Sequence, residues 1–281
     1  MKFWVPLICL PTEQYPPLAR AAERLGYEGV LVADHLAIPE AFGSVHPSGE
    51  NPFTHETEFP DAVAVIASLA AVTTRLRFMT YAYVLPLRDP FTVAKQFGTL
   101  SVLSGGRVAL GAAVGWLAEE FATVGADFRT RGARTDEILA VATDFWADGR
   151  AEHHGRFHDF GPAGMFPAPA APLPVLIAGK SDKALERAAR HDGWLGMNYG
   201  FDEIEERVAR LADLRKAAGD SRPDFEVFAI ANAMPEPATY TRLAELGVTA
   251  TAAMPWLVGD PTTASVDAKI AALEAFAATH L

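Results

Sequence analysis

Asp34 and His35 form the pair of residues best suited to chemistry in this 281-residue sequence. An imidazole titrates near neutral pH, so a histidine at an active-site rim can give or take a proton. The adjacent carboxylate of Asp34 can orient that histidine or bind a hydroxyl group of a ligand. The alternative is that Asp34 only caps a helix and that His35 is a passive neighbour. The pair therefore predicts acid–base catalysis if the fold brings it to a ligand.

Aromatic residues and glycines elsewhere in the chain indicate a binding site for a flat ligand. Tyr81 and Tyr83 follow an apolar run, and on a regular strand their rings point to opposite sides. Gly111 and Gly115 leave the backbone bare around the end of another apolar run, and Trp116 adds an apolar surface beside them. The alternative for the tyrosines is that their rings only fill the mouth of the fold.

A third segment, Gly179-Lys180-Ser181, is suited to an anion. It opens a predicted helix, where free backbone N–H groups, a hydroxyl group and the helix dipole favour a phosphate. The segment lacks the upstream glycine of a P-loop, so the alternative is an ordinary capped helix. Because the net charge of the chain is −11, any phosphate must be held by local geometry rather than by a basic surface.

Composition and motifs argue against several other functions. The 24 Lys and Arg residues against 35 Asp and Glu residues disfavour nucleic acid and anionic membranes as partners. The single cysteine, Cys9, allows no intramolecular disulfide and fits a reducing cytoplasm. No apolar run reaches the ~18 residues of a membrane helix, so we expect a cytoplasmic protein. Metal chemistry is not expected, because the following histidines lie in predicted loops without partners at metal-ligand spacing: His46, His55, His153, His154 and His158.

Short apolar runs alternate with helical patterns along the whole chain, which is typical of parallel strands joined by crossover helices. Strands are predicted over residues 3–9, 30–33, 76–84, 107–112, 174–178, 194–197, 225–229 and 248–253. Helices are predicted over residues 13–25, 61–72, 90–103, 117–124, 134–146, 182–191, 202–218, 237–246 and 263–279. This pattern predicts one α/β domain over residues 1–281, a (β/α)8 TIM barrel with an irregular excursion over 149–172. The alternative is an open doubly wound sheet.

The candidate residues then follow the carboxyl ends of strands, where barrel enzymes place their active sites. In order and content, these segments resemble the bacterial luciferase-like superfamily of flavin- and deazaflavin-dependent oxidoreductases, over nearly the whole chain. The resemblance is carried by residues 21–35, 73–90, 103–121, 131–137 and 192–194. The compact length and the Arg-Gly-Ala-Arg-Thr-Asp-Glu run at 131–137 look most like the branch called F420-dependent.

The resemblance implies where a cofactor would lie. Its ring would occupy the barrel mouth, supported by a bulge with a non-proline cis peptide, which by position is the Tyr81–Ala82 bond. Asp34 and His35 would face the ring and the substrate, and segment 179–181 would carry the phosphate. The residues expected to border the cofactor are Asp34, Tyr81, Ala82, Gly111, Gly115, Trp116, Gly179, Lys180 and Ser181.

The function implied is transfer of a hydride between coenzyme F420 and a small organic substrate, with His35 managing the proton. The alternative keeps the fold but uses reduced FMN and oxygen, as a monooxygenase served by a separate reductase. A second alternative is a barrel that binds a flavin without turnover. By the same resemblance, a homodimer through helices near the second and third strands is expected, since residues 62–71 offer a face of small side chains.

Two departures from the resemblance bear on the substrate. Trp116 stands where deazaflavin-dependent sugar-phosphate dehydrogenases carry a glutamate, and Glu119 stands where they carry an asparagine. A sugar phosphate is therefore disfavoured, and Trp116 indicates a more apolar or conjugated substrate. Tyr81 replaces a small residue found in several members and would narrow the pocket.

Overall fold

Parallel strands form a closed ring in the computed structural model, which describes residues 1–49, 51, 53–256 and 264–281. Around the ring, each strand pairs with the next, and β3 pairs with β5 to close it. The ring strands are β1 (Lys2–Leu7), β2 (Gly29–Val32), β3 (Arg77–Thr80), β5 (Val108–Ala113), β8 (Val175–Ala178), β9 (Gly193–Tyr199), β10 (Glu226–Ala231) and β11 (Ala250–Ala252). The predicted (β/α)8 barrel is confirmed, and the open sheet is excluded.

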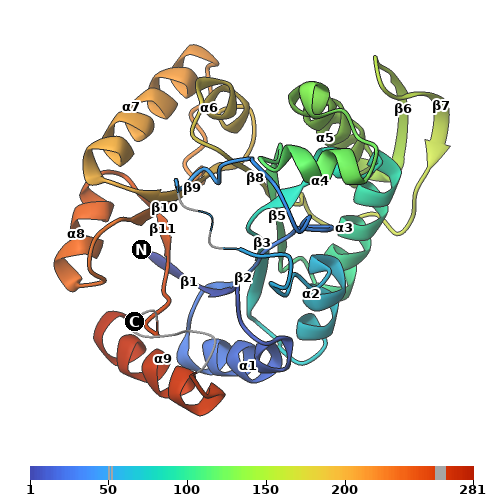
Figure 1. Cartoon of the computed structure of the whole chain (residues 1–281). Helices are drawn as coiled ribbons and strands as arrows, with labels where there is room; N and C mark the ends of the chain where they lie inside the picture. The colour runs from blue at the N-terminus through green and yellow to red at the C-terminus, as the bar shows by residue number, and fades with distance from the viewer. Residues whose placement is uncertain (50, 52, 257–263) are drawn as a thin grey trace.

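Helices surround this ring on its outside (Figure 1). They are α1 (Tyr15–Leu25), α2 (Ala62–Ala70), α3 (Pro90–Ser104), α4 (Ala118–Thr123), α5 (Arg131–Asp148), α6 (Asp182–Ala188), α7 (Phe201–Ala217), α8 (Pro237–Glu245) and α9 (Val266–His280). Their ends follow local chemistry: Asp61 and Asp89 accept from the N–H groups of Ala64 and Thr92, and Gly26 ends α1 at a φ of 88°. Within the described residues, each helix is too short or too polar to cross a bilayer.

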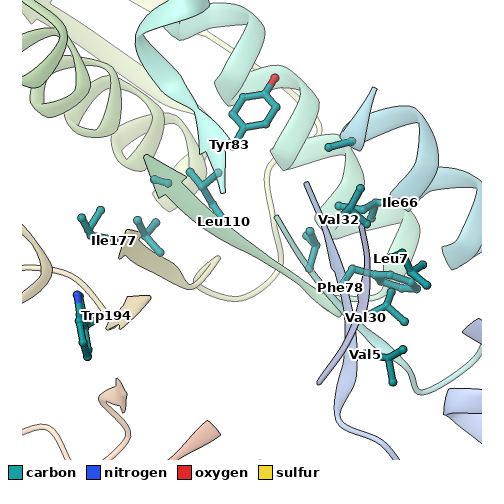
Figure 2. Packing of buried hydrophobic residues seen from close by; sticks show 14 of the residues in the cluster. Val5, Leu7, Val30, Val32, Ile66, Phe78, Tyr83, Leu110, Ile177 and Trp194 are labelled. Carbon is teal, nitrogen blue, oxygen red and sulfur yellow. The ribbon is translucent and has the colours of Figure 1, made fainter. Parts of the chain in front are cut away.

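Two apolar cores hold the barrel together. The inner core fills the ring and consists of Trp4, Leu31, Met79, Ala109, Leu176, Leu195, Phe228 and Ala250. The outer core lies between strands and helices, and Figure 2 shows part of it: Val5, Leu7, Val30, Val32, Ile66 and Phe78. Successive side chains of a strand point to opposite faces, so the ring strands other than β11 supply both cores and have few polar positions.

The 149–172 segment is not irregular as predicted, because it contains an antiparallel hairpin of β6 (Arg150–His154) and β7 (Asp159–Gly164). The hairpin lies outside the helix ring beside α5 (Figure 1). Its Phe160 ring packs 4.8 Å from that of Phe91 and 6.1 Å from that of Phe145. Half-buried and exposed positions alternate on β6, as on a strand with one covered face, but glycines and a proline in β7 and its surroundings obscured this signal in the sequence.

Some predicted boundaries also change. The predicted strand 76–84 is interrupted after Thr80 and resumes as β4 (Tyr83–Val84), which pairs with β5. The predicted helix 134–146 extends over Arg131–Asp148. The last helix begins at Val266, and the predicted start at 263 lies outside the described residues. Positions 50 and 52 of the connection between β2 and α2 also lie outside them.

Candidate active site

His35 lies just beyond β2, at the carboxyl end of the barrel, with its side chain only 7% exposed. Its Nδ1 is 2.9 Å from Oε2 of Glu120, a carboxylate that is 1% exposed. The other oxygen of Glu120 accepts hydrogen bonds from the N–H groups of Leu36 at 2.6 Å and Ala37 at 3.3 Å. The imidazole is therefore oriented by Glu120 on α4 and not by its sequence neighbour Asp34.

Asp34 forms a separate, buried ion pair. Its Oδ1 and Oδ2 each accept a hydrogen bond from Arg88, both at 2.6 Å, and Oδ2 also accepts from the N–H of Val84 at 2.8 Å. The side chains of Asp34 and Arg88 are 2% and 8% exposed. The Arg88 guanidinium also lies over the Tyr83 ring, 4.1 Å from its centroid. Asp34 thus ties the end of β2 to β4 and to the turn that follows.

The interruption between β3 and β4 contains the expected cis peptide at Tyr81–Ala82. On its amino-terminal side, the Thr80 hydroxyl donates to the carbonyl oxygen of Gly111 and accepts from its N–H, at 2.9 and 3.0 Å. A Cβ on Gly111 would lie 1.9 Å from the Thr80 carbonyl oxygen. The missing side chain of Gly111 is therefore required by the close approach of β3.

Tyr81 turns into the barrel, whereas Tyr83 packs outward. The Tyr81 hydroxyl donates to the carbonyl oxygen of Gly196 at 2.8 Å, and its ring lies 5.3 Å from that of Phe228 in the inner core. Burial raises the pKa of Tyr81 well above its usual value, so the phenol stays protonated. The Tyr83 ring packs 5.1 Å from that of Phe97 on α3. Tyr81 thus belongs to the barrel mouth and Tyr83 to the outer core.

Above the inner core, the barrel mouth has a floor of mostly small side chains. The residues packed on that core are Tyr81, Ala82, Ala178, Ile230 and Ala252. Three of these are alanines, so the floor keeps the space above it free of bulky groups. Such a surface suits a flat ring system.

An aromatic box covers His35 from the loop side. We define the aromatic box as Phe42, His46, Phe53, Phe59 and Trp116. The His35 ring lies 4.9 Å from Phe59, 6.0 Å from Phe53 and 5.9 Å from Trp116. His46 lies 5.0 Å from Trp116 on another side. Trp116 therefore contacts both imidazoles, neither of which was predicted as its neighbour.

His46 is a neutral member of this box. Its Nδ1 lies 2.6 Å from the Ser48 hydroxyl, and its ring packs 5.5 Å from Phe53. Burial and the neighbouring His35 lower the pKa of His46 to about 4. The ring is therefore uncharged at neutral pH. His46 lies in a loop, as predicted, and this loop folds back onto the barrel rim and half-buries the ring.

The loop that supplies most of the box crosses the barrel opening (Figure 1) and is tied down on both sides. On the α4 side, Glu119 accepts from the N–H groups of Gly43 at 2.8 Å and Ser44 at 3.2 Å. Hydrogen bonds from Ser44 and Gly43 lower the pKa of Glu119, so its carboxylate is charged. On the β8 side, Lys180 Nζ donates to the carbonyl oxygen of Pro47 at 3.0 Å.

Segment 179–181 begins α6 as predicted. Gly179 adopts a φ of 135°, and its carbonyl oxygen accepts from the Trp194 indole N–H at 2.8 Å. Ser181 is the N-cap residue, and its hydroxyl oxygen accepts from the N–H of Ala184 at 3.3 Å. Lys180 and Ser181 are exposed. The segment is a capped helix start, and the same groups are exposed and could contact an anion.

The structure brings some of the predicted residues together and gives others different surroundings. His35 and Trp116 share the box, and Tyr81 and Ala82 share the floor. Gly115, at a φ of 83°, has no room for a Cβ, which would lie 2.7 Å from Phe121. Within the described residues, no group of three or more His, Cys, Asp or Glu side chains is arranged to hold a metal ion.

Sequence reasoning missed Glu120, Arg88 and the loop members of the box. Glu120 follows Glu119 in the first turn of α4, and a charged pair at a helix start reads as an exposed acidic turn. Arg88 lies in a proline-rich turn with no periodic pattern. The only signal for the box was an unusual density of aromatic residues in a polar loop.

Comparison with known sequences finds relatives along most of the chain. Residues 13–237 match the family described as luciferase-like monooxygenase. A protein of Mycobacterium tuberculosis (strain ATCC 25618 / H37Rv), described as uncharacterized, is 38% identical over 269 residues. The match covers 94% of this chain and 93% of that protein.

Two solved structures share the fold. Monooxygenase RslO1 from Streptomyces bottropensis has a TM-score of 0.69 and 26% identity, over 88% of this chain and 75% of that one. The coenzyme F420-dependent tetrahydromethanopterin reductase from Methanopyrus kandleri has a TM-score of 0.74 and 16% identity, over 98% of this chain and 97% of that one. At 16% identity, the similarity to the reductase shows a shared fold and nothing about function.

Proposed function

This chain belongs to the luciferase-like monooxygenase family, and we propose that it is an oxidoreductase that transfers a hydride between coenzyme F420 and a small, flat, uncharged organic substrate. One observation carries the proposal. The His35 imidazole, held by the buried Glu120 carboxylate, lies inside an aromatic box at the carboxyl end of the barrel. The choice of F420 follows the resemblance of residues 131–137 to the F420-dependent branch.

The residues of the barrel mouth fit such a cofactor. A deazaflavin, when bound, supplies hydride chemistry and reacts poorly with oxygen. The floor of alanines leaves room for its fused rings, with Tyr81 and Ala82 beneath them. The Ala184 N–H is bonded to Ser181, but the N–H groups of Asp182 and Lys183 begin α6 and, together with Lys180, match a phosphate. These groups would hold the cofactor between the floor and the aromatic box.

His35 would manage the proton that accompanies hydride transfer. Nδ1 is occupied by Glu120, so Nε2 is the ring atom left to exchange a proton with the substrate. The surrounding Phe59 and Trp116 rings exclude water from the imidazole. A histidine in a dry, apolar setting can hold its proton for the substrate rather than lose it to solvent.

The charges around the box favour an uncharged substrate. Glu119 and Glu120 are both acidic, and Arg88 is neutralised by Asp34. The box itself consists of apolar rings and the neutral His46. An anionic substrate would meet no unpaired cation among these residues and would be repelled by the two carboxylates. A flat conjugated molecule with a carbonyl or hydroxyl group matches the rings and the imidazoles.

A second candidate function is an FMN-dependent monooxygenase that receives reduced flavin from a separate reductase. The specific observation that favours it is the similarity to monooxygenase RslO1, at 26% identity over 88% of this chain. The same floor and the same segment 179–181 would serve FMN. In that case His35 would act as a base beside the flavin.

Fluorescence-quench titration of the purified protein with F420 and with FMN, at matched ionic strength, separates these functions. Tight binding of F420 with weak binding of FMN would support hydride transfer. A preference for FMN would support the monooxygenase and direct the assay to oxygen consumption with a reductase. Binding of either cofactor without any turnover of flat substrates would leave a non-catalytic barrel, and binding of neither would contradict both enzymes.

We also propose that the protein forms a homodimer through α2 and α3. The two helices pack side by side; Val102 and Leu103 of α3 are 44% and 66% exposed, and Val72, just beyond the end of α2, is 38% exposed. Small residues of α2 beside them allow close approach of a second copy. Sedimentation velocity of the wild type and of Leu103→Glu tests this, and a monomeric wild type would contradict it.

A further inference from the structure

A buried carboxylate with three hydrogen-bond partners is an unusual feature of the rim. Glu120 is 1% exposed, and Oε2 lies 2.9 Å from His35 Nδ1. Oε1 accepts from the N–H groups of Leu36 and Ala37 at 2.6 and 3.3 Å. Burying a carboxylate costs several kcal/mol unless it is well paired, so these contacts must hold it in one orientation.

We propose that Glu120 is a positioning residue that keeps neutral His35 in the tautomer protonated at Nδ1, so that Nε2 presents its lone pair to the reacting groups. A carboxylate can only accept hydrogen bonds, so the shared proton must come from Nδ1. Within the described residues, His35 Nε2 makes no hydrogen bond, and the ring is packed between Phe59 and Trp116. This inference rests on the proposed role of His35 in proton transfer.

Among the described residues, the neighbouring carboxylates Asp34 and Glu119 have other partners and do not replace Glu120 in this role. Both oxygens of Asp34 already accept from Arg88, and one also accepts from the Val84 N–H. Glu119 points to the backbone of the loop at Gly43. In the part of the chain that the structure describes, the tautomer of His35 thus depends on Glu120, which lies 85 positions further along the chain.

The backbone around Glu120 makes Glu120→Gln an informative variant. The N–H groups of Leu36 and Ala37 need an acceptor, so they select the orientation in which the glutamine carbonyl oxygen faces them. The amide NH2 group then faces His35 Nδ1 and donates to it. His35 must take the opposite tautomer, with its proton on Nε2, and it can no longer accept a proton there.

The test is ¹⁵N NMR of histidine-labelled protein, without cofactor or substrate, at a pH where the imidazole is neutral. The His35 signals are assigned by their loss in His35→Asn. The wild type should show a protonated Nδ1 and an unprotonated Nε2, and Glu120→Gln should show the reverse. Glu119→Gln is the matched control, because Glu119 lies on the same turn of α4 and also binds loop backbone. It should leave the His35 tautomer as in the wild type.

The wild-type spectrum alone can overturn the inference: a proton on Nε2 would show that Glu120 does not set the tautomer. An unchanged tautomer in a folded Glu120→Gln would overturn it as well. With a substrate in hand, kcat of Glu120→Gln should fall by roughly 100-fold or more, the contribution typical of a general acid or base. A reversed tautomer with full turnover would leave the inference standing and overturn the proposed role of His35 instead.

Discussion

The barrel rim is built differently on its β2 side and on its β8 side. On the β2 side, the buried carboxylates Asp34 and Glu120 have every oxygen hydrogen-bonded to a cation, an imidazole or the backbone. On the β8 side, Lys180 and Ser181 are exposed, and the one hydrogen bond of the Lys180 side chain within the described residues is to the Pro47 carbonyl oxygen of the loop. The groups suited to proton transfer are thus fixed before any ligand binds. Those suited to an anion keep contacts that a ligand can replace at little cost.

The carboxylates on the β2 side are fixed by being buried together with their partners, and burying a charge is costly. The β2 side is therefore sensitive to mutation. A buried ion pair contributes little relative to an apolar pair, but removal of one partner leaves the other charge uncompensated. An exposed cation carries no such cost. The contrast therefore predicts large losses of stability on the β2 side and losses confined to binding on the β8 side.

The largest effect is expected for Arg88→Met. The variant leaves the Asp34 carboxylate, 2% exposed, without its cation, and the free energy of unfolding should fall by about 3–5 kcal/mol in urea denaturation. The matched control is Arg24→Met, because the Arg24–Glu274 pair is 58% and 48% exposed and should be worth at most ~1 kcal/mol. Equal losses in the two variants would show that the β2 side is not held by the Asp34 pair.

The next effect is on turnover. His35→Ala should lower kcat by roughly 100-fold or more, because the group that exchanges the proton is lost. The dissociation constant of the cofactor, measured by fluorescence quenching, should stay unchanged, since the floor and segment 179–181 remain. His55→Ala on the same loop, at an exposed position, is the control. Equal losses in turnover and affinity would make His35 a binding group.

On the β8 side, Lys180→Ala should weaken binding of the cofactor without altering stability. The loss of one hydrogen bond to a charged group is worth about 1.5–3 kcal/mol, so the dissociation constant should rise by roughly tenfold or more. Urea denaturation should give the wild-type free energy of unfolding, and Lys216→Ala on α7 is the control for the loss of a charge. Unchanged affinity would remove segment 179–181 from the cofactor site.

The sequence predicted the barrel because the fold depends on a signal that repeats. Most ring strands supply both cores, so apolar runs and amphipathic helices recur along the chain. The conformation at Tyr81–Ala82 was also predicted, from the resemblance rather than from local chemistry. The packing role of Gly111, which makes room for Thr80, is not revealed by periodicity.

The hydrogen-bond partners of Asp34 and His35 could not be predicted from the sequence, because these partners lie far away along the chain. Asp34 meets Arg88 across 54 positions, and His35 meets Glu120 across 85. Nothing in the local pattern tells Glu119 from Glu120, although one holds the loop and the other the imidazole. The run at 131–137, which resembles the F420-dependent branch, has structural contacts here, since Asp136 binds Arg187 of α6 at 2.6 Å.

The smallest expected effect concerns His46, which the closed loop keeps neutral. Its pKa is lowered to about 4 from 6.5, so between these values the unfolded chain binds a proton that the folded protein does not. The free energy of unfolding should therefore fall as the pH falls from 6.5 to 4, and this contribution should vanish above 6.5. Because His46 is only partly buried, solvent screening reduces the loss to roughly 1 kcal/mol.

The measurement is urea denaturation of the wild type and of His46→Phe at pH 7 and at pH 5. Phenylalanine keeps the ring contact with Trp116 but cannot titrate, so it isolates the proton from the packing. All other titrating groups are common to both proteins and cancel in the difference. Relative to the wild type, the free energy of unfolding of His46→Phe should be higher at pH 5 than at pH 7. His55→Phe, at an exposed position of the same loop, should show no such change. A difference that does not change with pH would mean that the loop leaves His46 in water, and that the β2 side is less closed than its contacts imply.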